Sequence, residues 1–301
     1  MTQSAVTLSG HSNRAAPILT APTQAVSGWD VVRKLGEGQL AEVYLARPLA
    51  STVDAPAGYA LKVLRPAWQY DLRVLEMFCQ EARVGRRICH PNVVPILDAG
   101  LHQAPYFVVM PRLEGATLAQ RLARGEQLSL PTALWIARQV AQGLAALDGD
   151  GWMHNDVKPS NIFVASTAHA TLIDLGFAQR IEELTGLSER PVLGTTRYMA
   201  PEMLSASLVP DIRSDIYSLG VTLFEMLTGR FPYGAEDVAE LARQHRQMAC
   251  AVLRKHAPHV PSRVARLVHQ MLSKDPTRRP QNPSEVVERL VALEIEAFAQ
   301  R

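Results

Sequence analysis

The sequence predicts an α+β fold in two lobes, a small strand-rich N-terminal lobe followed by a larger, mainly helical C-terminal lobe. Short runs of Val, Tyr, Leu and Phe, broken by Gly and Pro, predict strands at 29–37, 41–47, 58–65, 93–99 and 105–110. One helical pattern, over about 72–87, interrupts these strands, and after Gly115 the apolar periodicity becomes helical. Two such lobes usually enclose a cleft, and clefts bind ligands.

The order of the elements predicts the domain boundaries. Residues 1–28 carry one charge and no hydrophobic period, which predicts a mobile tail. The strand-rich lobe is expected at 29–112 and the helical lobe at 113–298. Within the second lobe, helices are expected at 131–147, 212–228, 236–247, 261–272 and 284–298, with a short strand pair at 162–165 and 170–173.

Composition excludes several classes of protein. Of the 301 residues, 47% are apolar, which excludes global disorder. The 31 basic residues nearly balance the 29 acidic ones, so we expect no nucleic-acid partner of the kind that binds a polycation. We expect no membrane span and no secretory signal in this chain, and the three cysteines form no metal-binding spacing or disulfide framework. We therefore expect a cytoplasmic protein; the composition says nothing about oligomeric state.

Lysine is scarce and two lysines occupy unusual positions. The chain has five, against 26 arginines. Lys62 lies inside an apolar strand, where an ammonium group is costly unless it meets an anion. Glu81, nineteen residues later in the predicted helix, could supply that anion. Alone, these two residues favour a lysine whose stem covers the surface and a solvated glutamate. The paired Gly36 and Gly38 between two strands could lie over phosphates, but alone they also fit an ordinary hairpin.

The segment 154–161, His-Asn-Asp-Val-Lys-Pro-Ser-Asn, is the most informative motif. It places a carboxylate, an ammonium and a carboxamide within six residues of a loop stiffened by proline. These groups suit phosphoryl transfer, in which an acid orients a hydroxyl, a lysine offsets phosphoryl charge and an amide ligates a metal. Asp174 follows a predicted strand thirteen residues after Asn161 and could share that metal or simply form a turn. Asp215 lies near the start of a predicted helix, and on its own it could simply be a capping group of the first turn.

Together these motifs resemble the eukaryotic-like (Hanks-type) serine/threonine protein kinases, as found in bacteria. The motifs occur in the family's order over about residues 29–298. The resemblance implies a bilobal protein kinase-like fold, ATP and Mg²⁺ as cofactors with Mn²⁺ as an alternative ion, protein substrates phosphorylated on Ser or Thr, autophosphorylation, and a role in signalling. It also implies a buried ion pair between Glu202 and Arg279, and a brace from Asp215 to the loop 154–161.

The resemblance assigns roles residue by residue. Lys62 would contact the α- and β-phosphates with Glu81 as its partner, Asp156 would be the catalytic base and Lys158 would stabilise the transferred phosphoryl group. Asn161 and Asp174 would ligate the metal ion. Thr195 resembles the threonine that bonds the base and the loop lysine. The family's glycine-rich loop matches Gly36 and Gly38, with Ala41 in place of the third glycine. The remaining nucleotide contacts would come from Leu35, Val43, Ala60, Met110, Pro111, Leu113 and Phe163.

Two departures from the family pattern concern regulation. Asn155 replaces the arginine that balances an activation-loop phosphate in many kinases. Pro191 stands four residues before Thr195, where the family often places its phosphoacceptor. We therefore expect activity without phosphorylation at that site. The alternatives are a pseudokinase that binds nucleotide as a scaffold, which predicts loss of catalytic residues that are present, and a small-molecule phosphotransferase, which normally lacks the Ala-Pro-Glu segment at 200–202.

Overall fold

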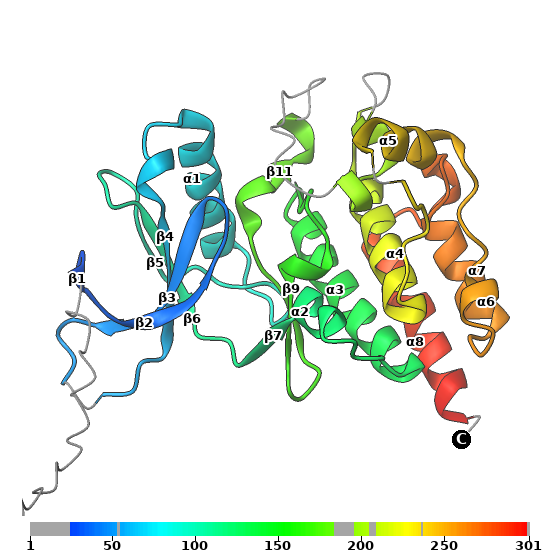
Figure 1. Cartoon of the computed structure of the whole chain (residues 1–301), viewed down its shortest axis with the longest axis horizontal. Coiled ribbons are helices and arrows are strands. Elements are labelled where there is room, and N and C mark those ends of the chain that lie inside the picture. Colours follow the sequence, from blue (N-terminus) through cyan, green and yellow to red (C-terminus); the bar gives the residue numbers. More distant parts are fainter. Residues whose placement is uncertain (1–24, 53–54, 184–195, 205–208, 236, 300–301) are drawn as a thin grey trace, which may run out of the picture.

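The computed structural model describes residues 25–52, 55–183, 196–204, 209–235 and 237–299. A strand-rich lobe lies beside a helical lobe (Figure 1), as the sequence predicts. The first lobe is a six-stranded antiparallel sheet in the order β1-β2-β3-β4-β6-β5. Its strands are β1 (Ala25–Val26), β2 (Trp29–Glu37), β3 (Ala41–Pro48), β4 (Tyr59–Leu64), β5 (Asp98–Gly100) and β6 (Phe107–Pro111).

Helix α1 (Leu72–Arg87) is the main helix of the first lobe, and it begins and ends as predicted. The Asp71 side chain accepts hydrogen bonds from the backbone N–H groups of Arg73 and Val74, which satisfies two donors that an uncapped helix would leave exposed. The buried face of α1 carries Val74, Phe78 and Ala82, which form one apolar cluster with residues of the sheet. This packing fixes the helix on the sheet.

The helical lobe surrounds one long, nearly buried helix, α4 (Ile212–Thr228), in which 14 of the 17 residues are buried. Helix α3 packs against both α4 and α8. Figure 1 shows α6 and α7 at the end of this lobe away from the sheet. The other helices are α2 (Leu118–Ala123), α3 (Leu130–Gly149), α5 (Val238–Gln247), α6 (Leu253–His256), α7 (Ser262–Met271) and α8 (Pro283–Ala299).

Short strands and turns complete the fold. β7 (Gly115–Thr117), β9 (Ile162–Ala165) and β10 (Ala170–Leu172) form a sheet in the order β10-β9-β7, and β8 (Trp152–Met153) pairs with β11 (Gln179–Arg180). Short 3-10 turns occur at Pro66–Trp68, Pro159–Asn161, Leu175–Phe177, Ile181–Glu183, Thr196–Tyr198, Pro201–Leu204 and Pro276–Arg278. No helix within the described residues is both long enough and apolar enough to cross a bilayer.

Two expectations from the sequence are wrong in detail. The strand predicted at 93–99 is shorter and later, at β5, because the preceding backbone bonds elsewhere: the N–H of Val94 donates to Leu172 and that of Ile96 to Gly85. The predicted tail to residue 28 is also too long. Residues 25–26 form β1, which pairs with the start of β2, because Val26 is buried in an apolar cluster of the sheet.

Candidate active site

The hairpin between β2 and β3 carries the glycine-rich loop. Within it, the N–H of Gly38 donates to the carbonyl of Ala41 at 2.8 Å. A Cβ built on Gly36 would meet nothing within 4 Å, so the space beside this glycine is open. The methyl group of Ala41, at the third glycine position, is instead buried in the cluster between the sheet and α1. The replacement of glycine there therefore fills core space and leaves the loop open.

Two side chains from the link between β4 and α1 hold this loop. Arg65 donates from Nε to the carbonyl of Gly38 at 3.0 Å, and Trp68 donates from Nε1 to the carbonyl of Gln39 at 3.1 Å. The backbone N–H of Arg65 also donates to the carbonyl of Leu40. Three consecutive carbonyls of the loop are thus bonded to one neighbouring segment. Sequence reasoning missed this connection.

Lys62 lies where the two lobes meet. Its Nζ contacts the carboxylate of Glu81 at 2.7 Å and that of Asp174 at 2.9 Å. Burial alone would lower the pKa of Lys62, but the carboxylates of Asp174 and Glu81 raise it above its ordinary value, so the ammonium stays charged. The same charge holds the pKa of Asp174 below its ordinary value, although burial opposes this. The predicted lysine–glutamate pair therefore forms, and α1 stands close to β4.

The residues expected around the adenine lie on β2, β3, β4, β6 and β9, except Leu113, which follows β6. Lys62 pairs with Val43 on one side and Val108 on the other, and Ala60 pairs with Met110. Met110 packs against the cores of both lobes, which places it at their junction. Pro111 ends β6 and half-buried Leu113 follows it, while Phe163 is half-buried in β9 and Leu35 is exposed on β2.

The loop after β8 carries three of the expected catalytic groups in mutual contact. The Nζ of Lys158 lies 2.8 Å from Oδ2 of Asp156. Asn161 donates from Nδ2 to the same Oδ2 at 2.7 Å and to the carbonyl of Asp156 at 2.9 Å. Burial raises the pKa of Asp156 to about 6, against the opposing effect of Lys158. At neutral pH this carboxyl is mainly ionised, and it is a stronger base than an ordinary aspartate.

Asp215 supports this loop from the buried helix α4. Its two carboxylate oxygens accept hydrogen bonds from the backbone N–H groups of His154 at 2.7 Å and Asn155 at 2.8 Å. The brace expected from the sequence therefore forms. Asn155 adopts a left-handed backbone conformation with φ of 66°, which is strained for most residues other than glycine but is tolerated by asparagine. The two bonds from one carboxylate fix the backbone immediately before Asp156.

The side chain of Asn155 contacts neutral groups. Its Nδ2 donates to the carbonyl of Phe177 at 3.2 Å and to Oε1 of Gln179 at 3.4 Å. Both partners belong to the segment that follows Asp174. Where an arginine would carry a positive charge, this protein thus has an uncharged link between the catalytic loop and the start of the following segment.

Asn161 and Asp174 are brought side by side by the backbone. The N–H of Ile173 donates to the carbonyl of Asn161 at 2.9 Å. Together they offer carboxylate and carboxamide oxygens, the hard donors that Mg²⁺ prefers, and Mg²⁺ is usually held by one or two carboxylates plus substrate phosphates. No cluster of three or more His, Cys, Asp or Glu side chains able to hold a metal occurs among the described residues. The donor set therefore fits Mg²⁺ bound together with a nucleotide, and it does not form a closed protein site.

A buried ion pair supports the Ala-Pro-Glu segment at 200–202. Arg279 contacts both oxygens of Glu202, from Nη1 at 2.6 Å and from Nη2 at 2.8 Å, and Ser214 donates to Glu202 at 2.6 Å. The pair expected from the sequence is thus present. Thr195, with Pro191, lies outside the residues that the structure describes.

Comparison with known proteins identifies the family. Residues 29–290 match the protein kinase domain model. The chain belongs to the protein kinase family. The serine/threonine kinase PrkC of Bacillus subtilis is 32% identical over 255 residues, which cover 84% of this chain and 39% of that protein. The serine/threonine kinase pkn2 of Myxococcus xanthus is 35% identical over 270 residues, or 87% of this chain and 32% of that protein. PknH of Mycobacterium tuberculosis H37Rv is 35% identical over 249 residues, or 82% and 39%.

These matches confirm the predicted resemblance to bacterial serine/threonine protein kinases, together with the fold and the enzyme class. The kinase chain matches about a third to two fifths of the length of these relatives. Three side chains near the site make contacts that the sequence motifs do not predict. Gln80 of α1 donates to the carbonyl of Ala178, and Trp68 and Arg65 bond the glycine-rich loop. None of these three side chains belongs to a recognised motif of the sequence.

Proposed function

We propose that this kinase transfers the γ-phosphoryl group of Mg-ATP to Ser and Thr hydroxyls of proteins, including its own. One observation carries the proposal. Catalytic-type side chains form two groups, each in mutual contact: Lys62 with Glu81 and Asp174, and Asp156 with Lys158 and Asn161. A scaffold without catalysis has no need for a buried lysine paired with two carboxylates, because burying these charges is costly.

The proposed chemistry follows from the positions of these groups. Asp156 orients the substrate hydroxyl and accepts its proton as the oxygen bonds to the γ-phosphorus and the bond to the β–γ bridging oxygen breaks, which releases ADP. Lys158 offsets the charge of the phosphoryl group in transit, and Lys62 binds the α- and β-phosphates. Mg²⁺, or Mn²⁺ as an alternative ion, would be held by Asn161 and Asp174 and would neutralise phosphate charge.

Other residues of the proposed site hold the nucleotide. Gly36 and Gly38 would let the backbone approach the phosphates, because no Cβ stands between them. The side chains on β2, β3, β4, β6 and β9 would form the apolar walls around the adenine, and the backbone beyond β6 would bond its edge. The residues proposed for these contacts are Leu35, Val43, Ala60, Met110, Pro111, Leu113 and Phe163.

We also propose that activity does not require a phosphate on the activation loop. The uncharged contacts of Asn155 with Phe177 and Gln179 support this, because the link they make is independent of any phosphate. Complete dephosphorylation of the purified kinase should leave its rate on a peptide substrate unchanged. A collapse of that rate would refute this part of the proposal.

A cytoplasmic setting suits the use of ATP and the free thiols of the three cysteines.

Transfer of labelled phosphate from Mg-ATP to a mixture of Ser/Thr peptides and to the kinase itself tests the main proposal. Asp156→Asn should lower kcat by about 10²- to 10⁴-fold, the usual contribution of a general base. Glu288→Gln is the matched control, because Glu288 is exposed on α8 and its replacement also removes one carboxylate. Absence of transfer by the wild type, or equal transfer by Asp156→Asn, would favour a pseudokinase scaffold.

A further inference from the structure

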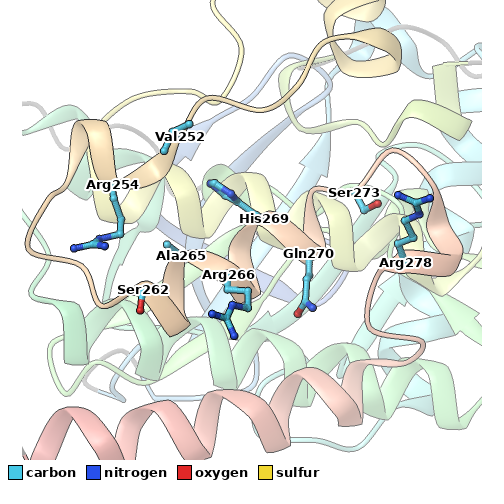
Figure 2. Close-up of a pocket in the computed structure, with 9 residues that line it drawn as sticks. All are labelled: Val252, Arg254, Ser262, Ala265, Arg266, His269, Gln270, Ser273 and Arg278. Atoms are coloured by element: carbon cyan, nitrogen blue, oxygen red, sulfur yellow. The ribbon is translucent and has the colours of Figure 1, made fainter.

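A groove lies at the end of the helical lobe farthest from the sheet. It is a cavity of about 590 Å³ between α6, α7 and the turn Pro276–Arg278. Figure 2 shows Arg254 at one end, Arg266 near the middle and Arg278 at the other end. Two rows of α7 side chains at four-residue spacing, which begin at Ser262 and at Ala265, form its long wall. The groove is therefore elongated, with a cationic side chain at intervals along it.

The charge of this region is unlike that of the rest of the chain. Residues 253–279 contain seven Lys and Arg but a single acidic residue, Asp275, whereas the remaining chain has 24 basic and 28 acidic residues. Three of the seven are occupied inside the protein or by an ion pair: Arg279 by Glu202, Arg263 by Glu296 and Lys274 by Tyr233. The excess positive charge that remains is concentrated around the groove, and it creates a local positive potential.

The arginines of the groove have little to neutralise them. Arg254 and Arg266 are exposed, and neither makes an ion pair or hydrogen bond with any other residue that the structure describes. Arg278 approaches Asp275 only at 3.6 Å, with 80% of its side chain exposed, and such a pair contributes little. Guanidinium groups bind carboxylates through two parallel hydrogen bonds, so these side chains are suited to a row of carboxylates.

The shape of the groove indicates the kind of partner. Val252, 48% exposed, and buried Ala265 supply apolar surface between the arginines. A hollow lined by polar and charged side chains takes up the side chains of a protein partner, whereas a flat lipid surface would touch only its rim. The spacing of the arginines along the groove favours an extended chain over a single small anion.

We propose that this groove docks an acidic segment of the protein substrate, away from the residue that is phosphorylated. The inference rests on the proposed function, since it names a property of the protein substrates. The groove is connected to the Ala-Pro-Glu segment through Arg279. This residue is the neighbour of Arg278 and holds Glu202 of that segment. A substrate bound at both places gains affinity from the increased effective concentration of its Ser or Thr at the active site.

Direct binding tests the groove without any need for catalysis. A fluorescein-labelled oligoglutamate peptide should bind the full chain, as measured by anisotropy, and binding should weaken at high salt. The variant R254E/R266E should bind it at least about tenfold more weakly, since each reversal replaces an attraction with a repulsion. R124E is the matched control for the single variant R266E, because Arg124 is exposed in the same lobe and outside the groove. Equal loss in R124E and R266E would overturn the proposal.

Kinetics then connect the groove to the reaction. A Ser/Thr peptide joined by a flexible linker to oligoglutamate should have a KM about tenfold below that of the same peptide joined to oligoasparagine. R254E/R266E should abolish this difference and leave the oligoasparagine substrate unaffected. An unchanged difference in the variant would refute docking at this site. If neither peptide is phosphorylated while oligoglutamate still binds the groove, the proposed function fails and the groove remains a site that binds anions. Binding to phosphatidylserine vesicles in place of the peptide, lost in R254E/R266E, would assign the groove to membranes and overturn the proposal.

Discussion

Replacement of Arg279 by Lys is the sharpest test of how the helical lobe is held together. The side chain of Arg279 is fully buried, and its guanidinium donates to the carboxylate of Glu202 and to the backbone carbonyls of Ser273, Arg213 and Lys274. A lysine keeps the positive charge and can still reach Glu202, but its compact ammonium group cannot span the other three acceptors. The substitution therefore removes the hydrogen bonds to these three carbonyls and retains the positive charge.

The expected loss of folding free energy follows from the number of carbonyls that lose their hydrogen bond to Arg279. Each of these three part-buried hydrogen bonds contributes about 1 kcal/mol, so Arg279→Lys should cost roughly 3 kcal/mol of folding free energy. In a chain of this size that corresponds to a fall in Tm of about 6–12 °C. Differential scanning calorimetry or circular dichroism melting measures it. Arg278→Lys is the control, because this neighbouring side chain is 80% exposed and its replacement should change Tm by no more than about 1–2 °C. A shift below about 2 °C for Arg279→Lys would refute the reasoning.

Three further predictions concern the site and its surroundings. Because the proposed base Asp156 has a pKa of about 6, kcat/KM should rise with pH through about 6 and level off above 7; a flat profile from pH 5 to 8 would contradict its role. Trp68→Phe keeps an aromatic ring, though a smaller one, and removes the N–H that bonds Gln39. The KM for ATP should therefore rise about threefold to tenfold with little change in kcat; an unchanged KM would show that the loop does not depend on this bond. Burial lowers the pKa of His245, which contacts Tyr217, to about 4. The unfolded chain takes up this proton near pH 6.5 and the folded one does not, so between pH 7 and pH 5 the wild type should lose about 2 kcal/mol more stability than His245→Asn; equal losses in denaturant titrations would count against it.

The sequence predicts elements well where local signals agree with packing. The predicted bounds of α4 match the structure because Asp211 caps its first turn and Gly229, with φ of 66°, ends it. The strand predicted at 93–99 fails for the opposite reason. Val93 and Ile96 form an apolar run typical of a strand, but their burial comes from contacts with distant residues, which no local pattern reveals.

The same distinction applies to the site. The proposed catalytic groups, such as Asp156 and Asn161, lie in short segments whose order and spacing are visible in the sequence. The side chains that support the loop and α1 are not visible in this way. Trp68 bonds a carbonyl 29 residues away and Gln80 one that is 98 residues away, and a tryptophan or glutamine at these positions has no spacing that predicts an acceptor. Their importance depends on tertiary structure alone.

The accessibility of Lys62, which lies between two carboxylates, can be followed with amine-reactive reagents. With so few lysines, acylation yields a simple pattern of modified peptides. Lys255 is exposed and will be modified readily, whereas Lys62 is held protonated and shielded, and thus is a poor nucleophile. Lys274, whose pKa burial lowers to about 8, has a larger unprotonated fraction. The relative labelling of these amines therefore provides a chemical footprint of the folded state, in which modification of Lys62 signals that α1 has moved away from the sheet.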